Sequence, residues 1–264
     1  MWSHNWSVLV YSDHFHMMYT GYPMKTVVFP PPDIVEQTAQ KVSATLTESV
    51  SVYEHVFLLL SAGSWVSVYQ SMAPLLASRD MGNLTVGLVD ERYVPKGHAD
   101  SNDRQISDSH LIKNLVSQGA TYIPVLQDID PGPTMTTLIA NTAYGEIFSH
   151  HPHVIMTLGL GPDGHTAGIL PSSSASLFDA RFHDHADLVY YETTPSETAN
   201  PYTKRITISP SSIQKADEII IYAAGAAKKP IIDRIETSDD PPYLFPAGIL
   251  RPLSDRVTVY TDVE

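Results

Sequence analysis

The sequence predicts an α/β fold in which a mostly parallel sheet is covered by helices on both faces. Two observations carry this prediction. Short apolar runs alternate with segments of helical periodicity, and several of the apolar runs lack the polar alternation of a half-exposed strand. Strands that are buried on both faces read in this way, and strand–helix alternation is typical of parallel sheets.

The strand candidates are short runs rich in valine, isoleucine, leucine and tyrosine. In chain order they are residues 25–29, 56–60, 84–89, 122–125, 154–159, 188–192, 205–209, 218–224 and 257–260. The first predicted helix, residues 32–48, begins with the start signals Pro32 and Asp33 and repeats apolar residues at helical spacing. The other predicted helices are residues 66–79, 103–117, 134–149 and 226–237.

The composition limits the class of protein. The chain has 264 residues, of which 43% are hydrophobic, and it contains no cysteine. This length and hydrophobic content suit one large domain, which we expect to span residues 24–264. The absence of cysteine excludes disulfides, thiolate metal sites and a cysteine nucleophile. The absence of cysteine also fits a protein of a reducing compartment, and we expect it to be cytoplasmic.

The charge limits the partners. A formal net charge of −13 argues against a general nucleic-acid binder, because phosphate backbones require a basic surface. It leaves room for a small anionic ligand held by a few focused cations. No apolar stretch approaches the roughly 18 residues that span a bilayer, so no membrane partner is expected. The sequence does not predict an oligomeric state.

Residues 1–23 are expected to lie outside the fold, because helical or strand periodicity is weak there and the domain pattern starts at Met24. They do not resemble a signal peptide, since the first basic residue is Lys25 and the apolar core is short. The alternative is that "SVLVY" within this segment adds an edge strand to the sheet.

The most distinctive stretch is "LGLGPDGHTAGILP", residues 158–171. An apolar strand ends there, and glycines surround Asp163 and His165. Histidine titrates near neutral pH, so His165 is the natural general base. Asp163 is placed to fix its tautomer or to bind a substrate hydroxyl. The alternative is that Asp163 caps a helix and His165 is structural.

Three other strand ends carry polar residues, and in parallel sheets ligands bind at these ends. Ser61, Gly63 and Ser64 follow the second strand and suit a phosphate loop at a helix N-terminus, unless Ser64 only caps that helix. Lys228 and Lys229 follow the strand 218–224 at a helix start, where cations oppose the helix dipole unless an anion lies between them. The alternative is that both lysines are solvated.

The third strand end reads Asp90, Glu91 and Arg92. Arg92 suits a phosphate, and Asp90 or Glu91 would orient it. The alternative is a solvated loop with an internal ion pair. Two histidine clusters, residues 150–153 and 183–185, lack the i, i+4 spacing of helical metal ligands, and no metal site is predicted.

These segments, in this order, resemble 6-phosphogluconolactonases, which form a wider family with the glucosamine-6-phosphate deaminases. "DERYVP…DSN" and "GLGPDGHTAGILP" are the specific parts, and "SAGS", "RITIS", "GAAK" and the end "VTVYTDVE" support them. The resemblance runs from about Met24 to the end. It implies a three-layer α/β/α fold of the NagB/RpiA-like type with a Rossmann-like sheet, and no cofactor. It also implies hydrolysis of the sugar phosphate 6-phospho-D-glucono-1,5-lactone in the oxidative pentose phosphate pathway.

The resemblance also assigns roles to individual positions. His165 matches the family's base, and Asp163 is its neighbour in the site. The positions that match groups near the substrate phosphate are Gly63, Ser64, Arg92, Lys228 and, as a common basic position, Arg205. We therefore expect His165 to activate water without a metal. Backbone N–H groups near residues 161–164 are candidates for stabilising the oxyanion.

The phosphate loop departs from the family. It usually reads Gly-Gly-Ser-Thr-Pro, whereas residues 62–66 here read Ala-Gly-Ser-Trp-Val. An alanine at position 62 requires a backbone angle that accepts a Cβ. The segment after the histidine usually reads Thr-Ala-Ser-Leu-Phe-Pro and here reads "TAGILP", a mild change.

Two rival functions follow from the same resemblance. The deaminase branch has a glutamate five residues after the histidine, where this chain has Leu170, which cannot transfer a proton. Thr166 and Arg92 also resemble the lactonase branch. A sugar-phosphate sensor that has lost catalysis is the other rival. Trp65 and Val66 favour it, and the lack of a DNA-binding appendage weakens it.

Overall fold

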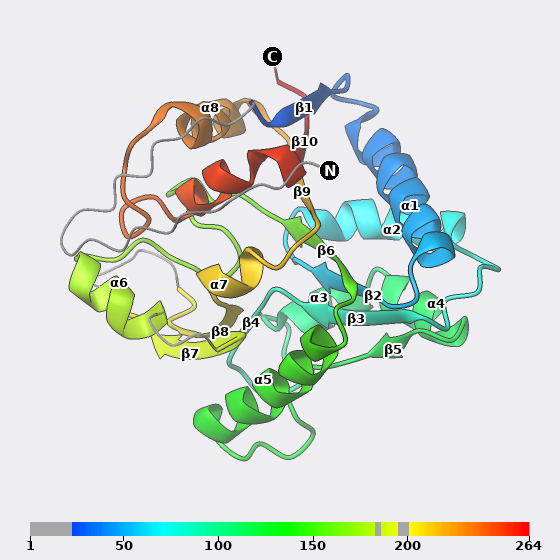
Figure 1. Ribbon diagram of the computed structural model, residues 1–264, viewed down its shortest axis with the longest axis horizontal. Coiled ribbons are helices and arrows are strands. Elements are labelled where there is room, and N and C mark those ends of the chain that lie inside the picture. The colour runs from blue at the N-terminus through cyan, green and yellow to red at the C-terminus, as the bar shows by residue number, and fades with distance from the viewer. Residues whose placement is uncertain (1–22, 183–185, 195–200, 264) are drawn as a thin grey trace, which may run out of the picture.

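A computed structural model describes residues 23–182, 186–194 and 201–263 of the chain. Its main sheet has seven strands in the order β1-β10-β9-β6-β2-β3-β5, and all neighbours are parallel (Figure 1). The bounds of these strands are β1 (Lys25–Val28), β2 (Val56–Leu60), β3 (Leu84–Leu88), β5 (Thr121–Tyr122), β6 (His153–Leu158), β9 (Glu218–Ala223) and β10 (Val257–Thr261). The predicted α/β fold with a mostly parallel sheet is confirmed.

Helices cover both faces of this sheet, because parallel strands need crossover connections and these are right-handed. Connections that run in opposite directions along the sheet therefore lie on opposite faces. The first helical layer contains α1 (Ile34–Val52), α2 (Trp65–Leu75), α3 (Asn102–Ser107) and α4 (Leu111–Ser117). The remaining helices are α5 (Pro133–Ser149), α6 (Ala175–Phe182), α7 (Pro210–Ile213), α8 (Lys229–Thr237) and the 3-10 helices η1 (Ala226–Lys228) and η2 (Pro246–Arg256).

A second sheet of three antiparallel strands has the order β4-β8-β7. Its strands are β4 (Asp90–Arg92), β7 (Leu188–Glu192) and β8 (Lys204–Ile208). The segments 188–192 and 205–209 are strands as predicted, but they belong to this separate sheet. The reading of residues 90–92 as a solvated loop is wrong, because Asp90 and Glu91 are buried in β4.

Other differences have local causes. The predicted helix 103–117 divides into α3 and α4, because His110 has a left-handed backbone with φ 64°. The strand predicted at 122–125 shortens to β5. The sequence did not reveal α6, α7 or η2. The proposed tail and its alternative edge strand fall almost entirely on residues 1–22, outside the described part of the chain, and stay predictions.

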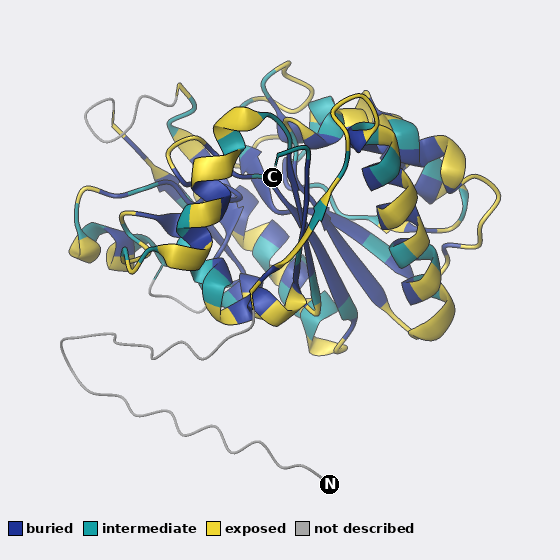
Figure 2. Cartoon of the chain, turned by 90° about the horizontal axis from the view of Figure 1, so that it is seen from above, coloured by how far each residue is buried: buried dark blue, intermediate teal, exposed yellow. Residues whose placement is uncertain are grey.

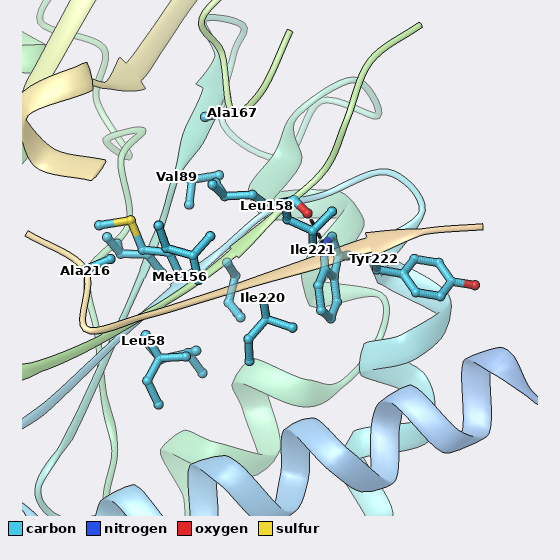
Figure 3. Close-up of a cluster of buried hydrophobic side chains, with 14 of the residues drawn as sticks. Leu58, Val89, Met156, Leu158, Ala167, Ala216, Ile220, Ile221 and Tyr222 are labelled. Atoms are coloured by element: carbon cyan, nitrogen blue, oxygen red, sulfur yellow. Dashed lines mark hydrogen bonds between the residues drawn. The ribbon is translucent and has the colours of Figure 1, made fainter. Parts of the chain in front are cut away.

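The strands form a core that is buried on both faces (Figure 2). In Figure 3, Leu58 and Ile220 project to one face of the sheet and Met156 and Leu158 to the other. All four are at most 4% exposed. This explains why the strands read as continuous apolar runs. Among residues 23–182, 186–194 and 201–263, no helix has the length and apolar character to cross a membrane.

Tyr144 of α5 holds the end of β3, just before the chain enters β4. Its hydroxyl accepts the backbone N–H of Leu88 at 2.7 Å and donates to the carbonyl of the same residue at 3.0 Å. The ring lies against Gly87, where a Cβ would come within 2.5 Å of the hydroxyl oxygen. A glycine is therefore needed at this position, and the tyrosine satisfies both polar groups of one buried residue.

Tyr144→Phe should lower the free energy of unfolding by about 1–3 kcal/mol, because the N–H and C=O of Leu88 would be buried without partners. Urea unfolding measures this as a lower midpoint with an unchanged slope. Tyr53→Phe is the matched control, since Tyr53 is 43% exposed and should change the midpoint little. Equal midpoints for both variants would show that Tyr144 does not hold β3.

Candidate active site

The predicted site residues follow strands that are neighbours in the main sheet. β9, β6, β2 and β3 are consecutive in the sheet order, and the loops that leave their carboxyl ends carry the four sequence motifs. In a parallel sheet all carboxyl ends lie on the same side, so the motifs converge there, as the sequence predicts. Two surface hollows of about 470 and 580 Å³ lie at the amino ends of the strands and contain none of the predicted site residues.

The centre of the site is the pair Asp163 and His165 in the turn after β6. The Nδ1 atom of His165 lies 2.5 Å from Oδ1 of Asp163, and the backbone N–H of His165 donates to the same oxygen at 3.1 Å. An ionised carboxylate only accepts hydrogen bonds, so Nδ1 is the donor, and in a neutral imidazole Nε2 then has the lone pair. No helix begins at Asp163 in the described residues, so the helix-cap reading is wrong.

The carboxylate is held in its ionised form. Burial alone would raise the pKa of Asp163, but the hydrogen bonds and the positive charge supplied by His165 lower that pKa below its ordinary value. At neutral pH, Asp163 is therefore available as an acceptor for Nδ1–H.

Two glycines make this geometry possible. A Cβ on residue 161 would lie 2.0 Å from Nδ1 of His165, so the imidazole occupies the space that a side chain at Gly161 would fill. Gly164 has φ +84°, and a Cβ there would lie 2.3 Å from the ring of Phe245, just before η2. Gly161 is thus required by the close approach of the ring, and Gly164 by both close approach and backbone angle.

Lys228 reaches the same turn from the end of η1. Its ammonium donates to the carbonyl oxygen of Leu160 at 2.5 Å. Partial burial lowers the pKa of Lys228, and the negative charge of Asp163 opposes that shift. The alternative that both lysines are solvated is wrong for Lys228, which is half-buried. It holds for Lys229, which is exposed and pairs with Asp233 at 3.1 Å.

The loop 61–64 joins the site from the end of β2. Ser61 is buried, whereas Gly63 and Ser64 are exposed ahead of α2. Gly63 has φ +70°, which few other residues adopt. Ser64 occupies the N-cap position, but its side chain makes no capping hydrogen bond. The backbone of Ala62 does not have positive φ, so its Cβ is accommodated.

Trp65 does not enter the loop. Its side chain is fully buried and packs on Tyr69, with ring centroids 5.4 Å apart. The indole N–H donates to the carbonyl of Leu158 at 2.9 Å, which ties the start of α2 to the end of β6. The departure from the family's loop therefore changes the core beneath the site and leaves the loop surface open.

Arg92 lies at the end of β4, in the second sheet. One guanidinium nitrogen donates to the carbonyl of Asp100 at 3.0 Å, and the guanidinium carbon lies 4.4 Å from the ring centroid of Tyr202. The hydroxyl of Tyr202 donates to the Asp100 carboxylate at 3.2 Å. Across the described residues, Nε of Arg92 is buried without a hydrogen-bond partner. Sequence reasoning missed Asp100 and Tyr202, because neither residue type marks such contacts.

Arg205 pairs directly with Arg92 across β4 and β8 but is almost fully buried. Its guanidinium lies 3.5 Å from the carboxylate of Asp90 and donates to the carbonyl of Tyr202 at 3.2 Å. In the described residues, neither arginine forms a hydrogen bond or ion pair with His165, Asp163 or Lys228. The structure therefore places the cations in two groups, Lys228 at the His165 turn and both arginines in the second sheet.

Gly168 connects the two groups. Its N–H donates to the hydroxyl of Thr207 in β8 at 3.0 Å, and its carbonyl accepts the hydroxyl of Tyr191 in β7. A Cβ at position 168 would lie 2.8 Å from Cβ of Thr207 and 3.1 Å from Cβ of Asp90. The segment that carries His165 is thus packed directly against the sheet that carries Arg92.

Three backbone amides of the turn, those of Gly161, Gly164 and His165, donate hydrogen bonds within it. The N–H of Gly161 donates to the carbonyl of His165, and that of Gly164 donates to the carbonyl of Gly161. Residue 162 is proline and has no N–H. The amide groups of Gly161, Gly164 and His165 are therefore committed, and they do not point freely at a substrate.

The histidine clusters do not form a metal site in the described residues, where no three suitable side chains gather. His153 instead pairs with Glu218 at 2.9 Å and stacks on Tyr53. The ring of His150 contacts the carbonyl of Glu146 at 2.9 Å. Residues 183–185 lie outside the described part of the chain.

Comparisons with known proteins agree on one family. The model described as glucosamine-6-phosphate isomerases/6-phosphogluconolactonase matches residues 31–259. The 6-phosphogluconolactonase of Caulobacter vibrioides is 28% identical over 228 residues, which cover 86% of this chain and 91% of that protein. That of Rhizobium meliloti is 27% identical over 237 residues, covering 87% and 94%. The crystal structure of a 6-phosphogluconolactonase from Shewanella baltica matches with a TM-score of 0.71 and 25% identity, covering 92% of this chain and 97% of that chain.

If His165 is the general base that the sequence predicts, Gly161→Ala should lower kcat by about 100-fold with a smaller effect on KM. The new methyl group would displace the imidazole, and a shift of about 1 Å in a reacting group has this effect. Steady-state kinetics on the substrate proposed below measures it. Gly145→Ala in α5 is the control. Its new Cβ would lie 3.6 Å from the nearest atom, a carboxylate oxygen of Asp187, which is an ordinary contact. An unchanged kcat for Gly161→Ala would mean that the position of the ring does not matter.

Proposed function

As the chain belongs to the glucosamine-6-phosphate isomerase/6-phosphogluconolactonase family, we propose that it hydrolyses 6-phospho-D-glucono-1,5-lactone to 6-phospho-D-gluconate. The observation that carries the proposal is the contact between Nδ1 of His165 and the Asp163 carboxylate, which leaves Nε2 as a base. The family relatives named above, which cover most of this chain, support the choice of substrate.

In the proposed reaction, neutral His165 removes a proton from water through Nε2, and the hydroxide attacks the lactone carbonyl carbon C1. The bond between C1 and the ring oxygen then breaks, and the imidazolium returns its proton to that oxygen. Asp163 stabilises the imidazolium between these steps and keeps the ring in its orientation. No metal is needed for this sequence, since the side chains move every proton.

Substrate positioning is assigned to the remaining site residues. Arg92, Lys228 and the loop of Gly63 and Ser64 are proposed to hold the phosphate, so that binding energy distant from C1 orients the carbonyl beside His165. Arg205 is assigned to the same region, where its pairing with Asp90 supports the strand that bears Arg92. The ammonium of Lys228, close to the turn, is also suited to the charge that develops on the carbonyl oxygen.

The two rivals are less well supported. In place of the glutamate that deamination would use, Leu170 is 1% exposed and apolar. The sensor hypothesis depended on Trp65 altering the phosphate loop, and the indole is turned into the core. We place the proposed reaction in the oxidative pentose phosphate pathway of the cytoplasm, which the cysteine-free sequence suits.

His165→Ala should lower kcat by about 10²–10⁴-fold with little effect on KM, because it removes only the general base. The measurement is a lactonase assay on freshly generated 6-phosphogluconolactone, with the spontaneous rate subtracted. A wild-type protein that does not exceed the spontaneous rate would overturn the function. Release of ammonia from glucosamine-6-phosphate would favour the deaminase, and tight phosphosugar binding without turnover would favour the sensor.

Arg92→Ala should raise KM by roughly 10- to 100-fold with a small change in kcat, as expected when a charge-assisted hydrogen bond to the phosphate is lost. Lys229→Ala is the control, because that lysine is exposed and bound to Asp233. A large loss of kcat at constant KM would contradict the role of a phosphate clamp.

A further inference from the structure

Glu91 is a completely buried carboxylate that the proposed reaction does not use. It lies between Asp90 and Arg92 in β4, with its side chain directed at the segment that starts α3. A charge in this position is costly unless it is fully hydrogen-bonded. The hydrogen-bond donors around Glu91 therefore indicate its role.

Four donors surround this carboxylate. Oε1 accepts the backbone N–H of Arg92 at 2.7 Å and that of Asn102 at 2.6 Å. Oε2 accepts the hydroxyl of Ser101 and the backbone N–H of Asp103, both at 2.9 Å. Three of the four donors belong to consecutive residues, 101–103. Glu91 thus fastens the first residues of α3 to the strand that bears Arg92.

The residue just before this fastened segment is Asp100, and it holds the side chain of Arg92. Its carbonyl accepts a guanidinium N–H at 3.0 Å, while its carboxylate accepts the hydroxyl of Tyr202, whose ring lies under the guanidinium. The backbone of Arg92 and the group that holds its side chain are therefore both tied to one carboxylate. A looser attachment at residues 101–103 would move the Asp100 carbonyl and release the guanidinium.

We propose that Glu91 is a positioning residue that sets the orientation of the Arg92 guanidinium for the substrate phosphate by anchoring residues 101–103, which follow Asp100 directly. The inference rests on the proposed function, because it assumes that Arg92 binds the phosphate. It predicts that the carboxylate acts on substrate affinity, through Arg92, and leaves the chemistry at His165 unchanged.

The hydrogen bonding requires two full acceptor oxygens. Burial raises the pKa of Glu91 to about 7, although all four donors favour the ionised form and oppose this shift. A glutamine has nearly the same shape, but its NH₂ group cannot accept a hydrogen bond. Glu91→Gln therefore leaves two of the four donors without an acceptor while filling the same space.

The test compares Glu91→Gln, Arg92→Ala and the double variant by steady-state kinetics on 6-phosphogluconolactone. Glu91→Gln should raise KM about tenfold, with kcat within about twofold of wild type. In the double variant, KM should be no more than about twofold above that of Arg92→Ala alone, because a residue that acts through Arg92 has no effect once it is gone.

Asp187→Asn is the matched control for general loss of stability. Asp187 is also a buried carboxylate, just before β7, and it accepts the hydroxyl of Ser212 in the short helix α7 at 2.7 Å and the ammonium of Lys215. It should lower the melting temperature to a similar degree and leave KM unchanged. If Glu91→Gln does not fold, Ser101→Ala, which removes one donor, carries the same test with an expected rise in KM of about threefold.

The outcomes separate this inference from the proposed function. If Arg92→Ala raises KM but Glu91→Gln does not, or if the two effects multiply in the double variant, the positioning role is overturned and the clamp stands. If Asp187→Asn raises KM as much as Glu91→Gln, the effect is general and the inference is also overturned. If Arg92→Ala leaves KM unchanged, the phosphate clamp itself fails, and the inference fails with it.

Discussion

The site depends on the imidazole of His165 standing in the space that any side chain at position 161 would fill. The chain can place it there because β6 ends in a glycine-rich turn that folds back on itself. The ring then lies against the backbone of Gly161, and its Nδ1 donates to the Asp163 carboxylate. This arrangement fixes the tautomer before substrate binds, so the proton transfer proposed for His165 would need little reorganisation of the ring.

The second sheet holds charged side chains close to the apolar core. β4 carries three successive charged residues, and each is contacted by residues that lie outside β4. Asp90 pairs with Arg205 in β8, Glu91 accepts donors from the start of α3, and Arg92 is held by Asp100 and Tyr202. The segment that carries His165 packs on this sheet through Gly168. A shift of the sheet would therefore move both the charged side chains and the imidazole.

The difference between the apolar strands of the main sheet and the charged strand β4 explains what the sequence could predict. Apolar runs between helical segments identified the strands of the parallel sheet, since burial on both faces leaves a strong local pattern. The convergence of motifs followed from the general rule for parallel strands. β4 could not be predicted, because aspartate, glutamate and arginine have no strand preference and their partners lie either eight to twelve or more than a hundred residues away. For the same reason the sequence pointed to Arg92 but not to Asp100 or Tyr202, which hold it.

An acidic chain that binds an anion requires its cations to be placed and protected individually. Lys228 illustrates the balance. Partial burial works against its charge, and the nearby carboxylate of Asp163 works in favour of it. Asp163 therefore serves two groups, since it orients the imidazole and supports the ammonium that reaches the same turn. Trp65, which stands where the family usually has threonine, does not interfere with these groups. Its buried indole donates to the end of β6 and does not cover the polar groups at the strand ends.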